Sequence, residues 1–392
     1  MTDPPGQAQA AKDAAFGALG RGDYRGAAEQ FARLLAAGPG DAATWFGLSL
    51  AHRKLGAAAE ENVALERALA LDGTYLPALI AKGDLYARQG DERAASSYYG
   101  AAIRLASAQP SLSPEWRREL QRVTDAMRVI TGRFEAHLLA ALSVHGLNGA
   151  GTERFGRALE LLLGKRQVFL QQPKYFYFPE LPQIQFYARQ EFPWAAALES
   201  STPRIRAELD ALLQQGAGIQ PYIQQVPDRP TFSANPLLNS MDWSAFYLVK
   251  DGAEVREHAA RCPATMAALS QLPLCRIGAR TPSILFSALR PGARIRPHHG
   301  FTNARLICHL PLIVPRDCAL RVGNETHVWR EGELVVFDDS MEHEAWNLSN
   351  ELRVVLLFDV WRPELTPTER SLVAATLEAV SRFEGAQRSW AD

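Results

Sequence analysis

The sequence has few cysteines and no long apolar or basic run. Four cysteines occur in 392 residues, and the spacing of Cys262, Cys275, Cys308 and Cys318 matches no metal-binding motif, which predicts reduced, buried thiols. No apolar stretch reaches the ~20 residues that a membrane span needs. A formal net charge of −1 without a basic stripe argues against nucleic acid as a main partner. The polar start MTDPPGQAQAAKD lacks the features of a secretory signal, so we expect a cytoplasmic protein with no membrane span.

The length of 392 residues predicts two to three domains of α and β structure, and an apolar content of 47% is ample for their cores. Residues 8–108 carry a 34-residue period. It comprises three glycines (Gly22, Gly56, Gly90), three large residues nine positions later (Phe31, Leu65, Tyr99) and three aliphatic residues after those (Leu35, Leu69, Ile103). This period predicts tetratricopeptide-like repeats, each a helical hairpin with glycine at its turn. Ala27 and Ala95 allow close packing, whereas Glu61 replaces the small residue in the middle repeat.

Residues 109–170 read as a helical connector. Ser113 is a candidate N-cap, and apolar residues follow it at helical spacing: Leu120, Val123, Met127 and Ile130. The remaining residues, 171–392, form the third predicted region. Their pattern changes from helical spacing to short apolar segments between turns.

Five of the nine histidines lie within the 46 residues from His298 to His343. They lie in or near short segments rich in Val, Leu, Ile and Phe. Examples are ARLICHLPLIV, ELVVFDD and RVVLLFDVW, and turn signals separate these segments. This pattern predicts an antiparallel β-sandwich or barrel. Histidines on successive strands predict a pocket that binds a metal, because neutral imidazole is a common ligand of iron, zinc, copper and nickel.

Two spacings suggest how the pocket is built. If NLSN (347–350) closes a hairpin, His343 and Arg353 lie opposite each other, about 5 Å apart at Cβ. Arg305, Ile307 and His309 share one face of their strand, because side chains alternate. Arg353 begins the apolar segment RVVLLFDV, and an arginine buried in such a strand requires an anionic partner. A dicarboxylate keto acid bound beside a metal would meet both needs.

The segments PHHGFTNARLICHLPL, GNETHVW, FDDSMEHEAW and FDVWRPELTPTER resemble the aspartyl/asparaginyl β-hydroxylase family of iron(II)- and 2-oxoglutarate-dependent oxygenases. The resemblance runs from about Pro173 to Arg370. It implies a double-stranded β-helix of the jelly-roll or cupin type with flanking helices in residues 171–392. It also implies a dioxygenase that uses Fe(II), 2-oxoglutarate and O2 to hydroxylate an unactivated carbon, namely the β-carbon of Asp or Asn residues in a peptide or protein.

Carried over residue by residue, the resemblance makes His298 and His343 the iron ligands. It makes Arg353 the partner of the side carboxylate of 2-oxoglutarate, with Ser287 donating a hydroxyl hydrogen bond and His309 contacting the other end. The carboxylate of the usual oxygenase triad would stand at Gly300, so the implied site has two protein ligands.

One position departs from the family. Ile307 replaces an arginine that some animal members carry, and Arg305 on the same face is the candidate to take over its contact with the cosubstrate. Ile307 favours an alternative in which a related oxygenase acts on a free amino acid, another small molecule or a lipid acyl chain. A second alternative is a non-catalytic module in which the repeats bind protein. A zinc hydrolase is disfavoured by the absence of HExxH. In the main hypothesis the repeats recruit a peptide or protein substrate.

Overall fold

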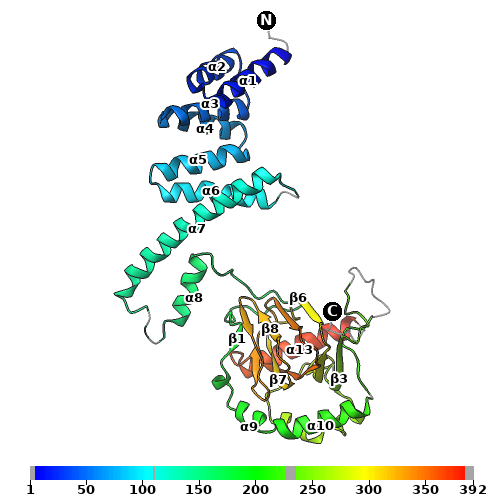
Figure 1. Cartoon of the computed structure of the whole chain (residues 1–392). Helices are drawn as coiled ribbons and strands as arrows, with labels where there is room; N and C mark the ends of the chain where they lie inside the picture. Colours follow the sequence, from blue (N-terminus) through cyan, green and yellow to red (C-terminus); the bar gives the residue numbers. More distant parts are fainter. Residues whose placement is uncertain are drawn as a thin grey trace. The chain divides into compact units, whose positions relative to one another are not determined.

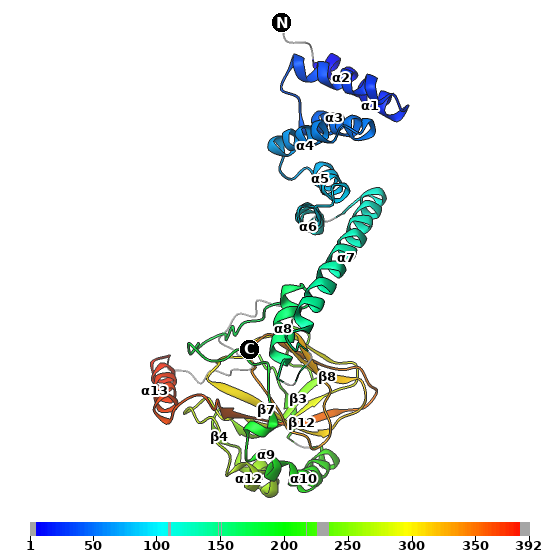
Figure 2. The same ribbon diagram turned by 90° about the vertical axis from the view of Figure 1, so that its left-hand side faces the viewer.

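The computed structural model describes residues 5–108, 111–147, 149, 151–216, 218–225 and 235–384. The chain divides into two compact units, Met1–Leu163 and Gly164–Asp392. The first unit is helical and the second is built mainly on β-sheet (Figure 1; Figure 2). The predicted combination of α-helical repeats with a C-terminal β-sandwich is therefore confirmed.

Six helices of the N-terminal unit form three consecutive hairpins (Figure 1). They are α1 (Pro5–Gly20), α2 (Tyr24–Ala37), α3 (Ala42–Leu55), α4 (Ala58–Leu71), α5 (Leu76–Arg88) and α6 (Glu92–Ser107). The turns inside the hairpins contain the three periodic glycines Gly22, Gly56 and Gly90, with φ of 81°, 76° and 79°. Glycine adopts these left-handed conformations without steric cost, which explains the 34-residue period.

The periodic large residues form the core of each hairpin. Phe31 and Leu65 are fully buried and Tyr99 is 2% exposed. Glu61, which stands where the other repeats have alanine, is also buried, and Arg88 Nη2 donates to both of its carboxylate oxygens at 2.7 and 2.6 Å. The middle repeat therefore replaces close packing with an ion pair.

Two further helices complete the N-terminal unit. Helix α7 (Pro114–Ser143) starts where the sequence predicts, because Ser113 Oγ accepts a hydrogen bond from Trp116 N at 3.3 Å. It packs on α6 through Val123 and Ile130. Helix α8 is Glu153–Leu162. Residues 109 and 110, at the predicted boundary between the repeats and the connector, lie outside the described residues.

Two antiparallel sheets make the C-terminal unit. The larger has the order β1-β10-β7-β12-β5-β3-β2, with β4 also paired to β3, and the smaller has the order β6-β11-β8-β9. The strands are β1 (Phe186–Tyr187), β2 (Gln220–Pro221), β3 (Trp243–Lys250), β4 (Ala253–Glu254), β5 (Ile284–Leu289), β6 (Arg294–His298), β7 (Arg305–Ile313), β8 (Cys318–Val322), β9 (Glu325–His327), β10 (Val335–Phe337), β11 (His343–Asn347) and β12 (Arg353–Trp361).

Side-chain alternation gives the larger sheet two buried faces. On β7, Leu306, Cys308 and Leu310 pack toward helices, whereas Ile307 packs into the core between the sheets. The helices on the outer face are α9 (Ala195–Ser200), α10 (Thr202–Gln215) and α12 (Pro263–Leu269) (Figure 2). The remaining helices are η1 (Arg189–Glu191), α11 (Arg256–Ala259) and α13 (Pro367–Glu384). Among the described helices, none has the length and apolar character to cross a bilayer.

The predicted hairpin at residues 347–350 is wrong. Strand β11 pairs with β6 and β8, and β12 pairs with β5 and β7. The segment between them therefore passes from the smaller sheet to the larger one. His343 consequently lies opposite His298 in the register of β11 and β6, and not opposite Arg353.

Candidate active site

Two histidines face each other across neighbouring strands of the smaller sheet. His298 ends β6 and His343 begins β11, and their ring centroids are 4.0 Å apart. His298 Nδ1 lies 2.8 Å from the carbonyl oxygen of Arg296, and His343 Nδ1 lies 3.0 Å from that of Met341. Because a carbonyl only accepts, each Nδ1 carries the proton. Each Nε2 is therefore left with a free lone pair, as a metal ligand requires.

The surroundings keep both imidazoles neutral. Burial lowers the pKa of His298 to about 3, and the neighbouring His343 acts in the same direction. Burial likewise lowers the pKa of His343 to about 4, although its hydrogen bond to Met341 opposes the shift. At neutral pH no proton competes for these nitrogens. The pair therefore fits a divalent metal with two imidazole ligands.

Asp339 occupies the place of the carboxylate that the oxygenase triad would carry at position 300. A Cβ atom on Gly300 would lie 2.0 Å from Asp339 Oδ2, so residue 300 cannot carry a side chain unless Asp339 moves. Asp339 is held by Arg305 at 3.0 Å, and Arg305 also pairs with Asp359 at 3.2 Å. Throughout the described parts of the chain, no three His, Cys, Asp or Glu side chains are grouped to bind a metal.

The other acidic residues near the histidine pair are engaged by arginines. Asp338 pairs with Arg362, and Arg321 pairs with both Glu342 and Glu344. Arg305 was predicted to contact the cosubstrate, but its guanidinium contacts two carboxylates. Its role in cosubstrate binding stays a prediction.

Arg353 is a buried cation without an anionic partner among the described residues. It is 1% exposed, and its guanidinium lies over the ring of Trp329 with 5.0 Å between Cζ and the ring centroid. Nη1 donates to the carbonyl oxygen of Ser287 at 3.4 Å, and Nε has no hydrogen-bond partner. Burial lowers the pKa of Arg353 to about 10, which still leaves it charged at neutral pH. A buried charge in this state is suited to bind an anion.

Two further buried nitrogens near Arg353 also lack partners in the described structure. They are Nδ1 of His309 and Nε1 of Trp329, whose rings are 5.8 Å apart. His309 is 7% exposed, and burial together with Arg353 lowers its pKa well below the ordinary value. Together with Nε of Arg353 they make three unsatisfied buried nitrogens, and a small carboxylate ligand would supply acceptors to those that carry a proton.

Ser287 lies on β5 beside this cluster. It is 2% exposed, and its Oγ accepts a hydrogen bond from Trp243 Nε1 at 3.1 Å. Its own hydroxyl proton remains available to a ligand. Trp243 in turn stacks on Tyr222, with 3.9 Å between ring centroids, and lies 6.5 Å from the ring of His298.

Sequence reasoning did not single out Trp243, Trp329 or Phe337, although their rings surround the predicted site residues. The ring of Phe337 lies 5.0 Å from that of His309 and 5.7 Å from that of His343. For Trp329 the sequence contained one usable signal: side-chain alternation in THVWR places it on the same side of the strand as His327. The contact of Trp243 with Ser287 joins residues 44 positions apart and leaves no local signal.

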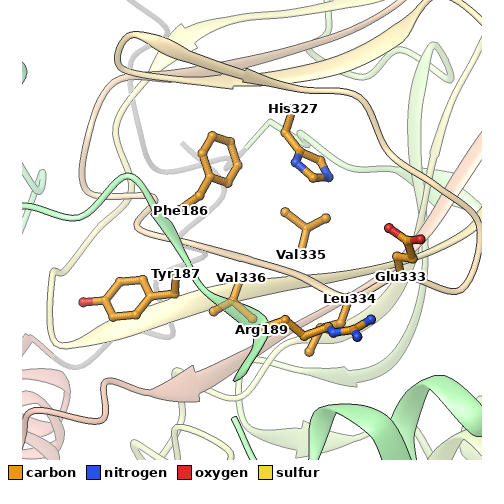
Figure 3. A pocket seen from close by; sticks show the side chains of 8 residues that line it. All are labelled: Phe186, Tyr187, Arg189, His327, Glu333, Leu334, Val335 and Val336. Atoms are coloured by element: carbon orange, nitrogen blue, oxygen red, sulfur yellow. The ribbon is translucent and has the colours of Figure 1, made fainter. Parts of the chain in front are cut away.

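A cavity of about 340 Å³ opens near this cluster at the edge of the larger sheet (Figure 3). Its lining residues come from β1, η1, β9, β10 and the segment before β10: Phe186, Tyr187, Arg189, His327, Glu333, Leu334, Val335 and Val336. His327 is partly buried here, with 5.6 Å between its ring centroid and that of Phe186. Val335 is the register partner of His309, so the cavity adjoins the anion site through one residue.

Residues 199–363 match the family model for aspartyl/asparaginyl beta-hydroxylase, and this range contains all six predicted site residues. Most of the C-terminal unit is therefore similar to this family. Aspartyl/asparaginyl beta-hydroxylase of Homo sapiens is 40% identical over 135 residues, which are 34% of this chain and 18% of that protein. The ornithine lipid ester-linked acyl 2-hydroxylase of Rhizobium tropici is 36% identical over 184 residues, which are 46% of this chain and 62% of that protein.

The chain thus spans less than two thirds of the length of either hydroxylase relative. Among solved structures, it is similar to the Yersinia enterocolitica type III secretion chaperone SycD in complex with a peptide of the translocator YopD. That likeness covers 33% of this chain and 96% of SycD, at 17% identity and a TM-score of 0.31.

Proposed function

We propose that the protein is an iron(II)- and 2-oxoglutarate-dependent dioxygenase that hydroxylates an unactivated carbon, with the β-carbon of Asp or Asn residues in a peptide or protein as the first candidate. One observation carries the proposal. Two neutral histidines with free Nε2 atoms lie in the same sandwich core as a buried arginine that has no carboxylate partner in the described structure. The family of the C-terminal unit supports the same chemistry.

His298 and His343 would bind the metal through Nε2. Their Nδ1 hydrogen bonds to backbone carbonyls fix both the tautomer and the ring orientation. When bound, iron(II) together with the keto acid would supply the oxidising power for the reaction with dioxygen. Because Asp339 fills the space beside Gly300, residue 300 adds no third side chain, and the two histidines would be the protein ligands of the metal.

Arg353 would bind the far carboxylate of 2-oxoglutarate. Burial strengthens this interaction, since the effective dielectric constant in the core is lower than in water. Ser287 can donate its hydroxyl proton to the same ligand while Trp243 donates to its oxygen. His309 and Trp329 present further unsatisfied nitrogens on the same side. These contacts would orient the keto acid and exclude water.

The test is succinate release from 2-oxoglutarate by the full-length protein with Fe(II), ascorbate and oxygen. It is run with and without a library of Asp- and Asn-containing peptides, with His343→Ala as the blank. Turnover stimulated by particular peptides supports the proposal. Turnover no higher than the blank under all conditions overturns it and favours a non-catalytic binding module.

Ile307 favours a second candidate, a hydroxylase of a lipid acyl chain or another small molecule. Ile307 is 6% exposed in the apolar core between the sheets. Arg305, on the same face of β7, is neutralised by two carboxylates. A wall of this kind suits an apolar group better than a charged one. The similarity to the ornithine lipid ester-linked acyl 2-hydroxylase of Rhizobium tropici supports this candidate. Turnover stimulated by acyl lipids and not by peptides would select it.

We also propose that the helical repeats recruit the peptide or protein substrate and that the protein works in the cytoplasm. Stacked helical hairpins generally present an extended surface for such a partner. Pull-down of a substrate peptide by the full-length protein, competed by the isolated peptide, is the measurement that checks recruitment. A small-molecule substrate would make this step unnecessary.

A further inference from the structure

A segment at the start of the C-terminal unit lies along both loops that carry the histidine pair. We call residues 171–178 the strap, residues 299–304 the first loop and residues 338–342 the second loop. The backbone N–H of Lys174 donates to the carbonyl of Gly300 in the first loop at 2.9 Å. The N–H of Gln172 donates to the carbonyl of Ser340 in the second loop at 2.8 Å. The strap therefore contacts the chain directly after His298 and shortly before His343.

The side chain of Gln171 links the two loops to each other. Its Nε2 donates to Asp338 Oδ2 in the second loop at 2.7 Å and to the carbonyl of Pro182 at 3.0 Å. Its Oε1 accepts from Asn303 Nδ2 in the first loop at 2.9 Å. Gln171 is 5% exposed, so these bonds form away from water. A buried amide with all these partners has one orientation.

The atoms that Gln171 joins are themselves fixed. Asp338 is fully buried, pairs with Arg362 at 2.9 Å and accepts from Ser340 N at 3.0 Å. Asn303 Oδ1 accepts from the strap at Phe178 N, at 2.6 Å. Arg362 makes a second link between the loops, because it also donates to the carbonyl of Asn303 at 3.1 Å. Loss of the Gln171 side chain would therefore weaken the connection between the two loops, while Arg362 would still hold them together.

Each of the two linked residues lies five positions from a histidine. Asn303 follows His298 by five residues, and Asp338 precedes His343 by five. In a metal site with only two protein ligands, the distance between those two side chains largely determines how well the metal is held. A site with three or four protein ligands depends less on any one distance, because the other side chains also restrain the metal. The distance between the loops at Gln171 thus bears on the 4.0 Å separation of the imidazole rings.

We propose that Gln171 is a positioning residue that holds the spacing of His298 and His343 and thereby sets the metal affinity of the site. The inference rests on the proposed function, because it assumes that the pair binds a metal. Gln171 lies outside the residues that match the family model, 199–363. Residues that orient metal ligands typically change metal affinity 10- to 100-fold when replaced. Since Arg362 remains as a second link, we expect about 10-fold for Gln171.

The test uses two neighbouring glutamines. Gln171→Met removes the buried bridge at nearly constant volume, and Gln172→Met makes the same change at the adjacent, exposed side chain. Binding of Mn²⁺ alone to each full-length protein is followed by electron paramagnetic resonance of free Mn²⁺, and thermal unfolding is recorded in parallel. The expected result is a Kd about 10-fold higher for Gln171→Met and an unchanged Kd for Gln172→Met. The visible spectrum of bound Co²⁺ should change for Gln171→Met alone.

An unchanged Mn²⁺ affinity in folded Gln171→Met overturns the inference and leaves Gln171 with a structural role. If that variant does not fold, Gln171→Glu takes its place. It keeps the acceptor for Asn303 but sets a carboxylate against Asp338, and an unchanged affinity there overturns the inference equally. A wild-type protein that binds neither Mn²⁺ nor Fe²⁺ overturns the proposed function as well. The two failures are thus told apart by the wild-type measurement.

Discussion

The two units each bury a cation almost completely, but they satisfy it differently. In the helical unit, Lys82 is 1% exposed, and its ammonium donates to Asn62 and to Glu66, the latter at 3.0 Å. In the sandwich, Arg353 is equally buried and has no carboxylate partner among the described residues. The ion pair of Lys82 is complete within the protein. Arg353 has no such partner in the described structure, and in the proposed function an anionic ligand supplies it.

The contrast is sharpest for Arg353→Met. We expect the affinity for 2-oxoglutarate to fall about 100-fold, because truncating one partner of a buried charge pair costs about 2–5 kcal/mol. Stability without ligand should stay equal or rise, since an unpaired buried charge is removed. Isothermal titration calorimetry and thermal unfolding measure the two effects. Lys82→Met is the matched control and should bind 2-oxoglutarate like the wild type; equal binding by both variants would contradict the comparison.

The ion pair of the middle repeat, between buried Glu61 and exposed Arg88, should show the opposite pattern. Arg88→Ala removes the partner of the buried carboxylate of Glu61, which should lower the free energy of unfolding of the helical unit by about 2 kcal/mol. Binding of 2-oxoglutarate should be unaffected. Urea unfolding followed by far-UV circular dichroism measures the loss. Arg33→Ala removes an exposed pair with Glu29 and should cost less than about 0.5 kcal/mol; a similar loss in both variants would refute the prediction.

The histidine pair should make the metal-free protein sensitive to acid. Burial lowers the pKa of His343 to about 4, whereas the unfolded chain binds the same proton near its ordinary value of 6.5. The unfolded state therefore gains protons first as pH falls, and the contribution of His343 to stability declines below that ordinary value by about 2 kcal/mol at about pH 5. Urea unfolding in EDTA at two pH values tests this. His343→Asn should decline less, and an identical decline would rule the explanation out.

The smallest effect is expected for Trp329→Phe. The substitution keeps an aromatic ring beside Arg353 but removes the unsatisfied Nε1–H. Losing one hydrogen bond to the ligand should weaken 2-oxoglutarate binding by about 1 kcal/mol, or about five-fold. Calorimetry on this variant and on Trp194→Phe, whose ring packs on Phe358 on the helical side of the sheet, gives the comparison. Unchanged binding would mean that the indole N–H does not face the ligand.

Much of this architecture could be read from local sequence patterns. The glycine period defined the hairpins, and alternation placed Ile307 and His309 on one face of β7, because both signals depend on neighbouring residues alone. The pairing of β11 could not be read in this way. A short connection such as 347–350 usually closes a hairpin, and only the three-dimensional structure reveals that it crosses between sheets.

The candidate site was also predictable only in part. The sequence drew attention to residues with charged or imidazole side chains, but it did not indicate which residues contact them. In the sequence, nothing distinguishes Asp339 from the other acidic residues near His343. Its position beside Gly300 depends on a contact between residues 39 positions apart. The role of Gln171 could not be predicted, because the sequence does not distinguish this buried glutamine from the exposed Gln172 beside it.

The contact between Gly300 and Asp339 also constrains how this site can evolve or be redesigned. A carboxylate introduced at position 300 would collide with Asp339 Oδ2, and shortening Asp339 alone would leave Arg305 with one carboxylate partner fewer. Neither substitution alone converts the pair of histidines into a three-ligand site. The two positions are therefore epistatic, and a mutational path from the pair of histidines to a site with a third carboxylate must change them together or pass through a weakened intermediate.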